Sequence, residues 1–108
     1  MKVFISQPMN GLSESEIRTT RDSCEKAIMN NFADVEIIDS YISDRIIRQE
    51  DGVSIPIQYL GHSILLLAEA QLAVFIDGYQ EARGCQIEYM VCEKYDIPTL
   101  RFIDGMLI

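Results

Sequence analysis

Cysteine and histidine are scarce in this chain. Its three cysteines, Cys24, Cys85 and Cys92, cannot all pair, and none belongs to a Cys-x-x-Cys motif. Neither a disulfide framework nor a zinc site is therefore predicted. Cys85 and Cys92 lie seven residues apart, on one face of a predicted helix, and we expect them to be small buried side chains. The single histidine, His62, is expected at the surface or in an interface, and no metal or redox cofactor is predicted.

Basic side chains are also few. Nine lysines and arginines stand against 17 aspartates and glutamates, which gives a net charge of -8. Nucleic-acid polymers and anionic membrane surfaces are bound by clustered Lys and Arg, so neither is an expected partner. A small nucleotide remains compatible with this charge, because loop amides and helix N-termini can bind a phosphate without net positive charge.

Long apolar runs are absent. No run approaches the roughly 18 residues of a membrane-spanning helix. The apolar start at residues 3–5 is too short for a signal peptide and soon reaches Pro8. We therefore expect a reduced, cytoplasmic protein. A chain of 108 residues, 48% hydrophobic and 24% charged, is predicted to form one domain over residues 1–108.

What the chain does contain is an alternation of strand and helix patterns. Strands are predicted at residues 3–5, 35–38, 72–76 and 99–103. Helices are predicted from the capping box Ser13-x-x-Glu16, from Pro56, and from Gly84 to near Asp96. This order predicts an α/β fold: a small Rossmann- or flavodoxin-like doubly wound sheet, mostly parallel, with four to five strands.

Two segments are harder to interpret. Residues 41–54 allow a helical turn at 44–48, and we expect this region to be mobile or to cover a site. The helix from Pro56 is apolar on more than one side, because Leu65 and Leu66 extend its apolar face. Such a helix either lies deep in the protein or meets a partner chain.

Loops that follow the first three strands meet at one edge of such a sheet, where open α/β sheets bind ligands. The main candidate there is Glu88, in the first two turns of the helix that follows the central strand. The helix dipole would help to keep it ionised, and flanking apolar residues would leave it poorly solvated. The other candidates from these loops are Ser6, Gln7, Pro8, Met9, Asn10, Gly11, Asp77, Arg83 and Gly84.

Two motifs carry a resemblance to a known family. The start, residues 3–11, ends in Pro8-Met9-Asn10-Gly11 and resembles the "strand, small residue, Pro-Met-x-Gly" opening of the nucleoside 2-deoxyribosyltransferase-like superfamily. It is most similar to the short bacterial and phage branch of unknown function. The second motif is a strand followed by Gly78-Tyr79, Gly84, Glu88 and Ile97-Pro98. Together they span nearly the whole chain.

The resemblance implies a Rossmann-like sheet, a homodimer or higher assembly, and cleavage of the N-glycosidic bond of a 2-deoxynucleoside or its 5-monophosphate. It gives Glu88 the role of nucleophile, forming a covalent glycosyl ester as retaining glycosidases do. Water or a second base would then accept the sugar. The loop at 6–11 would line the sugar or phosphate, and Asp77 and Arg83 would orient the ligand.

Two positions depart from the family pattern. Where the family has an Asp before the central strand, this chain has Ser63, preceded by His62. Where phosphate-binding members have a Ser, it has Ala82, beside Arg83, which can bind a phosphate directly. The alternatives are a nucleotide-binding module without turnover and an N-glycosidase acting on another nucleotide, such as NAD.

The candidates also have structural interpretations. Glu88 would be a solvated helix residue, and Asp77 would cap a turn at the end of its strand. Arg83 would be an exposed loop cation or a partner of Glu81. Tyr89 and Tyr95 are expected to be packing residues rather than a base-stacking surface.

Overall fold

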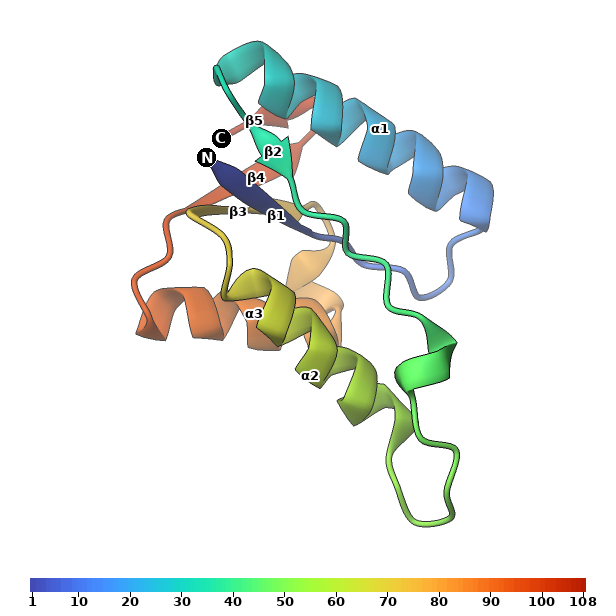
Figure 1. Cartoon of the computed structure of the whole chain (residues 1–108). Coiled ribbons are helices and arrows are strands. Elements are labelled where there is room, and N and C mark those ends of the chain that lie inside the picture. Colours follow the sequence, from blue (N-terminus) through green and yellow to red (C-terminus); the bar gives the residue numbers. More distant parts are fainter.

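The computed structural model describes all 108 residues and shows an α/β fold (Figure 1). The strands are β1 (Lys2–Ser6), β2 (Glu36–Ile37), β3 (Leu72–Ile76), β4 (Thr99–Ile103) and β5 (Met106–Leu107). The helices are α1 (Glu14–Asn31), α2 (Ile55–Leu67) and α3 (Arg83–Lys94), with two short 3-10 turns, η1 (Asp44–Ile46) and η2 (Tyr79–Glu81).

One five-stranded sheet with the order β2-β1-β3-β4-β5 forms the centre of the molecule. β1 to β4 pair in parallel, whereas β5 runs antiparallel to β4. This is the flavodoxin-like arrangement, in which the chain turns back between β1 and β3 and leaves a crevice at their carboxyl ends. The predicted fold class is therefore confirmed.

Helices cover both faces of the sheet, with α1 on one side and α2 and α3 on the other (Figure 1). Alternate residues of each central strand point to opposite faces, so Val74 packs in the cluster below α1 while Phe75 packs in the cluster below α3. Because both faces are covered, β3 is buried along its whole length. This explains why its sequence is continuously apolar.

The start of α1 confirms the predicted capping box. Ser13 Oγ accepts a hydrogen bond from the Glu16 amide at 3.1 Å, and Glu16 Oε1 accepts one from the Ser13 amide at 3.3 Å. The other two helices begin one residue earlier than predicted. Ser54 caps α2, which places Pro56 in its second position. α3 begins at Arg83 rather than at Gly84.

The sheet differs from the prediction at its two edges. β2 has two residues instead of four, although the Ile38 amide still donates to the Val3 carbonyl at 2.9 Å. The hairpin to β5 was missed. Asp104 and Gly105 both have positive φ angles, 51° and 77°, as the tight turns of two-residue hairpins require. The signal for this hairpin is the Asp104-Gly105 pair.

α2 contains only one buried residue. This residue is Leu67, so the helix does not lie deep in the protein. Ile57 and Leu65 are 69% and 66% exposed. None of the helices combines the length and hydropathy needed to cross a membrane.

Candidate functional site

A cavity of about 950 Å³ lies at the carboxyl ends of β1 and β3. Its volume is at the upper end of the range usual for small-molecule sites. Residues from the loop after β1, from the segment after β2, from α1 and α2, and from the start of α3 line it. The predicted convergence of three loops at this sheet edge is therefore present, and the two helices α1 and α2 contribute in addition.

Glu88 lies among the lining residues of this cavity and is only 6% exposed. Ser6, the last residue of β1, donates a hydrogen bond from Oγ to Glu88 Oε1 at 2.8 Å. Ser63, in α2, donates from Oγ to Glu88 Oε2 at 2.5 Å. Each carboxylate oxygen thus has its own hydroxyl donor, and these donors come from two different elements. This arrangement fixes the plane of the carboxylate.

The environment of Glu88 changes its acidity. Burial raises the pKa of Glu88 above its ordinary value, while the hydrogen bonds from Ser63 and Ser6 lower it and offset only part of the shift. The expected poor solvation is confirmed. The sequence also led us to expect that the helix dipole would help to keep Glu88 ionised. Burial has the larger effect, so the net shift of the Glu88 pKa is upward. The result is an oriented carboxylate that is more basic than one in water.

The end of β1 and the loop after it supply most of the predicted binding residues. Ser6, Gln7, Pro8, Met9 and Asn10 all line the cavity. Gln7 Nε2 donates to the Ile17 carbonyl at 2.8 Å, which orients the amide and leaves Gln7 Oε1 buried without a donor. Gly11 does not line the cavity; it lies in the turn before α1 with a φ angle of 78°.

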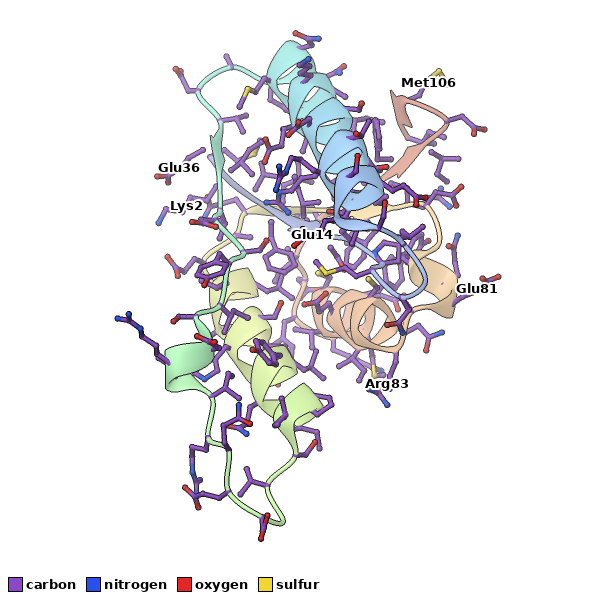
Figure 2. The ribbon with its side chains drawn as sticks, turned by 90° about the vertical axis from the view of Figure 1, so that its right-hand side faces the viewer. Lys2, Glu14, Glu36, Glu81, Arg83 and Met106 are labelled. Carbon is purple, nitrogen blue, oxygen red and sulfur yellow. The ribbon has the colours of Figure 1, made fainter.

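The candidates after β3 divide into two groups. Arg83 and Gly84 line the cavity. Asp77 does not line it: its Oδ1 accepts a hydrogen bond from the Gly78 amide at 3.0 Å, and Gly78 has a φ angle of 94°. The geometry of Asp77 is thus that of a turn cap. Arg83 forms no ion pair with Glu81, and Figure 2 shows the two side chains extending in different directions.

Several lining residues were not predicted. Arg18 and Arg21 reach the cavity from α1, and Tyr59 reaches it from α2. The spacing of Arg18 and Arg21 was a signal, because residues three apart share a helix face. That this face meets the cavity follows only from how α1 packs on the sheet. Ser63 was noted as a family departure, but not as a partner of Glu88.

The segment at 41–54 forms part of the site. Tyr41 and Ile42 line the cavity, as the expectation that the segment covers a site implied. The middle of the segment is joined to α2, because Gln58 Oε1 accepts from the Arg48 amide at 2.7 Å and Gln58 Nε2 donates to the Arg48 carbonyl at 2.9 Å. The predicted helical turn is present as η1.

The remaining predicted residues have structural positions. All three cysteines are buried and free. Burial raises the pKa of Cys24 to about 12 and that of Cys92 to about 11, which makes both thiols unreactive near neutral pH. Tyr89 packs against Phe75 with ring centroids 5.1 Å apart, as expected. Tyr95 does not pack, because it is 76% exposed.

His62 is partly buried and does not line the cavity. No group of three or more His, Cys, Asp and Glu side chains is placed to hold a metal ion. Fold and site thus define a doubly wound α/β protein with an oriented, buried carboxylate at its topological switch point. Comparisons with protein-family models, curated proteins and solved structures found no significant match to the chain.

Proposed function

We propose that the protein cleaves or transfers the N-glycosidic bond of a 2-deoxynucleoside or its 5-monophosphate, with Glu88 as the nucleophile. The observation that supports this most is the position of Glu88: it is buried at the cavity, and both of its oxygens accept hydrogen bonds from hydroxyls. A carboxylate that is oriented, poorly solvated and more basic than usual is suited to attack on an anomeric carbon.

The proposed reaction has two steps. A Glu88 oxygen forms a bond to the anomeric carbon, and the carbon–nitrogen bond breaks, so that the base leaves with the electron pair and takes up a proton. The product on the enzyme is a glycosyl ester of Glu88. Water or a second nucleobase then attacks the same carbon and gives up a proton, while the bond from that carbon to the Glu88 oxygen breaks. The products are the free sugar or a new nucleoside, and the carboxylate of Glu88.

The other lining residues receive supporting roles. Ser63, where the resembled family has an Asp, holds Glu88 through a neutral hydroxyl. Ser6 holds the other oxygen of the Glu88 carboxylate in the same way. The loop from Gln7 to Asn10 also lines the cavity. We give Asp77 no role in the chemistry, because its carboxylate caps a turn outside the cavity. No cofactor is required by this mechanism.

The test is a chromatographic assay for free base. Wild-type protein, Glu88→Gln and the control Glu93→Gln are incubated with deoxynucleosides, their 5-monophosphates and NAD, with and without an acceptor base. Glu93 is the matched control because it is exposed on the same helix. We expect release by wild type and Glu93→Gln, and a loss of at least about 1,000-fold in Glu88→Gln, because the nucleophile has no substitute.

Other outcomes would redirect the assignment. Release of nicotinamide from NAD alone would favour the alternative of a dinucleotide N-glycosidase. If no base is released but a nucleotide raises the melting temperature, the protein is a binding module without turnover. Equal release by wild type and Glu88→Gln would refute the role of Glu88.

We also propose that the protein is a homodimer that associates through the exposed face of α2. Residues 55–68 contain no charged side chain, although the chain as a whole carries a net charge of -8. Ile57 and Leu65 are largely exposed on this helix. Two acidic copies repel each other least where neither presents a charge, so this face is the favoured contact. The three free cysteines fit a reducing compartment, which we take to be the cytoplasm.

A further inference from the structure

The charge of the cavity is opposite to that of the protein. Its lining contains three arginines, Arg18, Arg21 and Arg83, and two carboxylates, Asp39 and Glu88. In the whole chain, by contrast, 17 acidic residues outnumber nine basic ones. A third of all basic side chains therefore lie around this one cavity. Such a local excess of cations raises the local concentration of an anionic ligand.

Two of these arginines are free to bind. Arg21 is engaged, since its Nε lies 3.2 Å from Glu25 Oε1 and it also donates to the Ile38 carbonyl at 3.4 Å. Arg18 and Arg83 form no ion pair or side-chain hydrogen bond within the chain. Their guanidinium groups keep all their donors available, in the planar geometry that suits a phosphate.

Aromatic side chains also line the cavity. Tyr41 and Tyr59 both belong to the lining, and they are 77% and 37% exposed. They come from the segment after β2 and from α2, whereas the free arginines come from α1 and α3. Exposed tyrosine rings beside a cavity offer flat faces on which a nucleobase can stack.

We infer that the ligand is a nucleotide rather than a nucleoside: Arg18 and Arg83 bind its phosphate, and Tyr41 and Tyr59 contact its base. The proposed reaction then requires the bond between sugar and base to lie at Glu88, which Ser6 and Ser63 hold in the same cavity. This assignment rests on the proposed function for the reaction, but not for binding. The shared chemistry is a phosphate joined to an aromatic base, which a nucleoside monophosphate and a dinucleotide such as NAD both provide.

The experiment is calorimetric binding to the full chain carrying Glu88→Gln, so that no turnover disturbs the measurement. The probes are the deoxynucleosides, their 5-monophosphates and NAD. We expect a phosphorylated compound to bind at least about 10-fold more tightly than the matching nucleoside. Adding Arg18→Gln or Arg83→Gln should remove most of this preference and leave nucleoside affinity unchanged. Adding Tyr59→Ala should weaken both kinds of ligand.

Arg45→Gln is the matched control, because Arg45 is an exposed arginine that does not line the cavity. It should preserve the preference for phosphate. NAD binding more tightly than any monophosphate would support the same inference with a dinucleotide as the ligand. Equal affinity for nucleoside and nucleotide, no binding of either, or an equal effect of Arg45→Gln would overturn it.

The two proposals can fail separately. Arginine-dependent nucleotide binding without base release by the wild type would leave this inference standing and remove the enzymatic one. Suppose instead that the wild type releases base from deoxynucleosides, and that Arg18→Gln and Arg83→Gln do not change this release. The enzymatic proposal would then stand, and the inference that the arginines bind a phosphate would fall.

Discussion

Glu88 is held by two serines that are far from it in the sequence. Ser6 precedes it by 82 residues and Ser63 by 25. Both donate to the carboxylate, and this favours its ionised form, yet burial has the larger effect and raises the pKa of Glu88. The fold therefore keeps Glu88 at a position where ionising its carboxyl group costs free energy. Such destabilising groups are common at functional sites.

This cost predicts how stability depends on pH. The folded-state pKa of Glu88 lies above the ordinary value of 4.5, so the folded protein binds the proton more tightly than the unfolded chain does. The contribution of Glu88 to stability is thus most favourable below pH 4.5, and it is progressively lost as the pH rises through the raised pKa. Glu88→Gln, which cannot ionise, should be more stable than wild type at neutral pH, with the difference closing on acidification.

Urea unfolding at a series of pH values measures this difference. Glu93→Gln serves as the control, because Glu93 is exposed and should change the pH dependence little. A Glu88→Gln variant that is less stable than wild type at pH 7 would mean that the two serine hydrogen bonds outweigh burial.

At the scale of elements, α1 both covers the sheet and supplies cations to the site. Its buried residues Cys24 and Ile28 pack on the sheet, while Arg18 and Arg21 line the cavity. The capping box at Ser13 determines where the helix begins, directly after the loop that carries Gln7 and its neighbours. The position of the arginines thus depends on a local signal that the sequence shows plainly.

Ser13→Ala should lower the free energy of unfolding by about 1 kcal/mol, because an orphan amide of the first turn loses its acceptor. For a domain of this size, that is a fall in Tm of roughly 4–8 °C. Differential scanning calorimetry measures it. Ser15→Ala is the control, since Ser15 lies exposed in the same turn and caps nothing. Equal effects of the two substitutions would show that the cap does not stabilise α1.

At the scale of the whole molecule, two surfaces differ in charge from the rest of this acidic protein. The cavity is the part where arginines outnumber carboxylates, and the exposed side of α2 is a part without charge. Ser63 and Leu65 lie on the same helix, one in the cavity and the other largely exposed. A partner chain on α2 would therefore lie close to the site.

Leu65→Glu tests the proposed dimer. Placing a carboxylate on the uncharged face should convert the dimer into a monomer, because two copies would then bury like charges against each other. Light scattering after size-exclusion chromatography gives the mass. Met90→Glu is the control, since Met90 is 53% exposed on α3. A monomeric wild type, or a Leu65→Glu variant that stays dimeric, would contradict the proposal.

The sequence by itself determined the elements and their class. Continuous apolar runs such as 72–76 predict strands covered on both faces, the Ser13 box marks a helix start, and the alternation of strands and helices predicts a parallel doubly wound sheet. These signals are local, because the period of apolar residues and the chemistry of a cap extend over only a few positions. Local signals also placed Glu88 near a strand's carboxyl end, because it lies in the first two turns of the helix that follows the strand at 72–76.

The tertiary structure decided which side chains meet. Ser63 contacts Glu88, and Arg18 reaches the cavity, because α2 and α1 pack at particular places on opposite faces of the sheet. Asp77 falls outside, although it follows the same strand as Arg83, because the turn at Gly78 engages its carboxylate. Distances between residues so far apart in the chain depend on how the elements pack, and no local pattern encodes them.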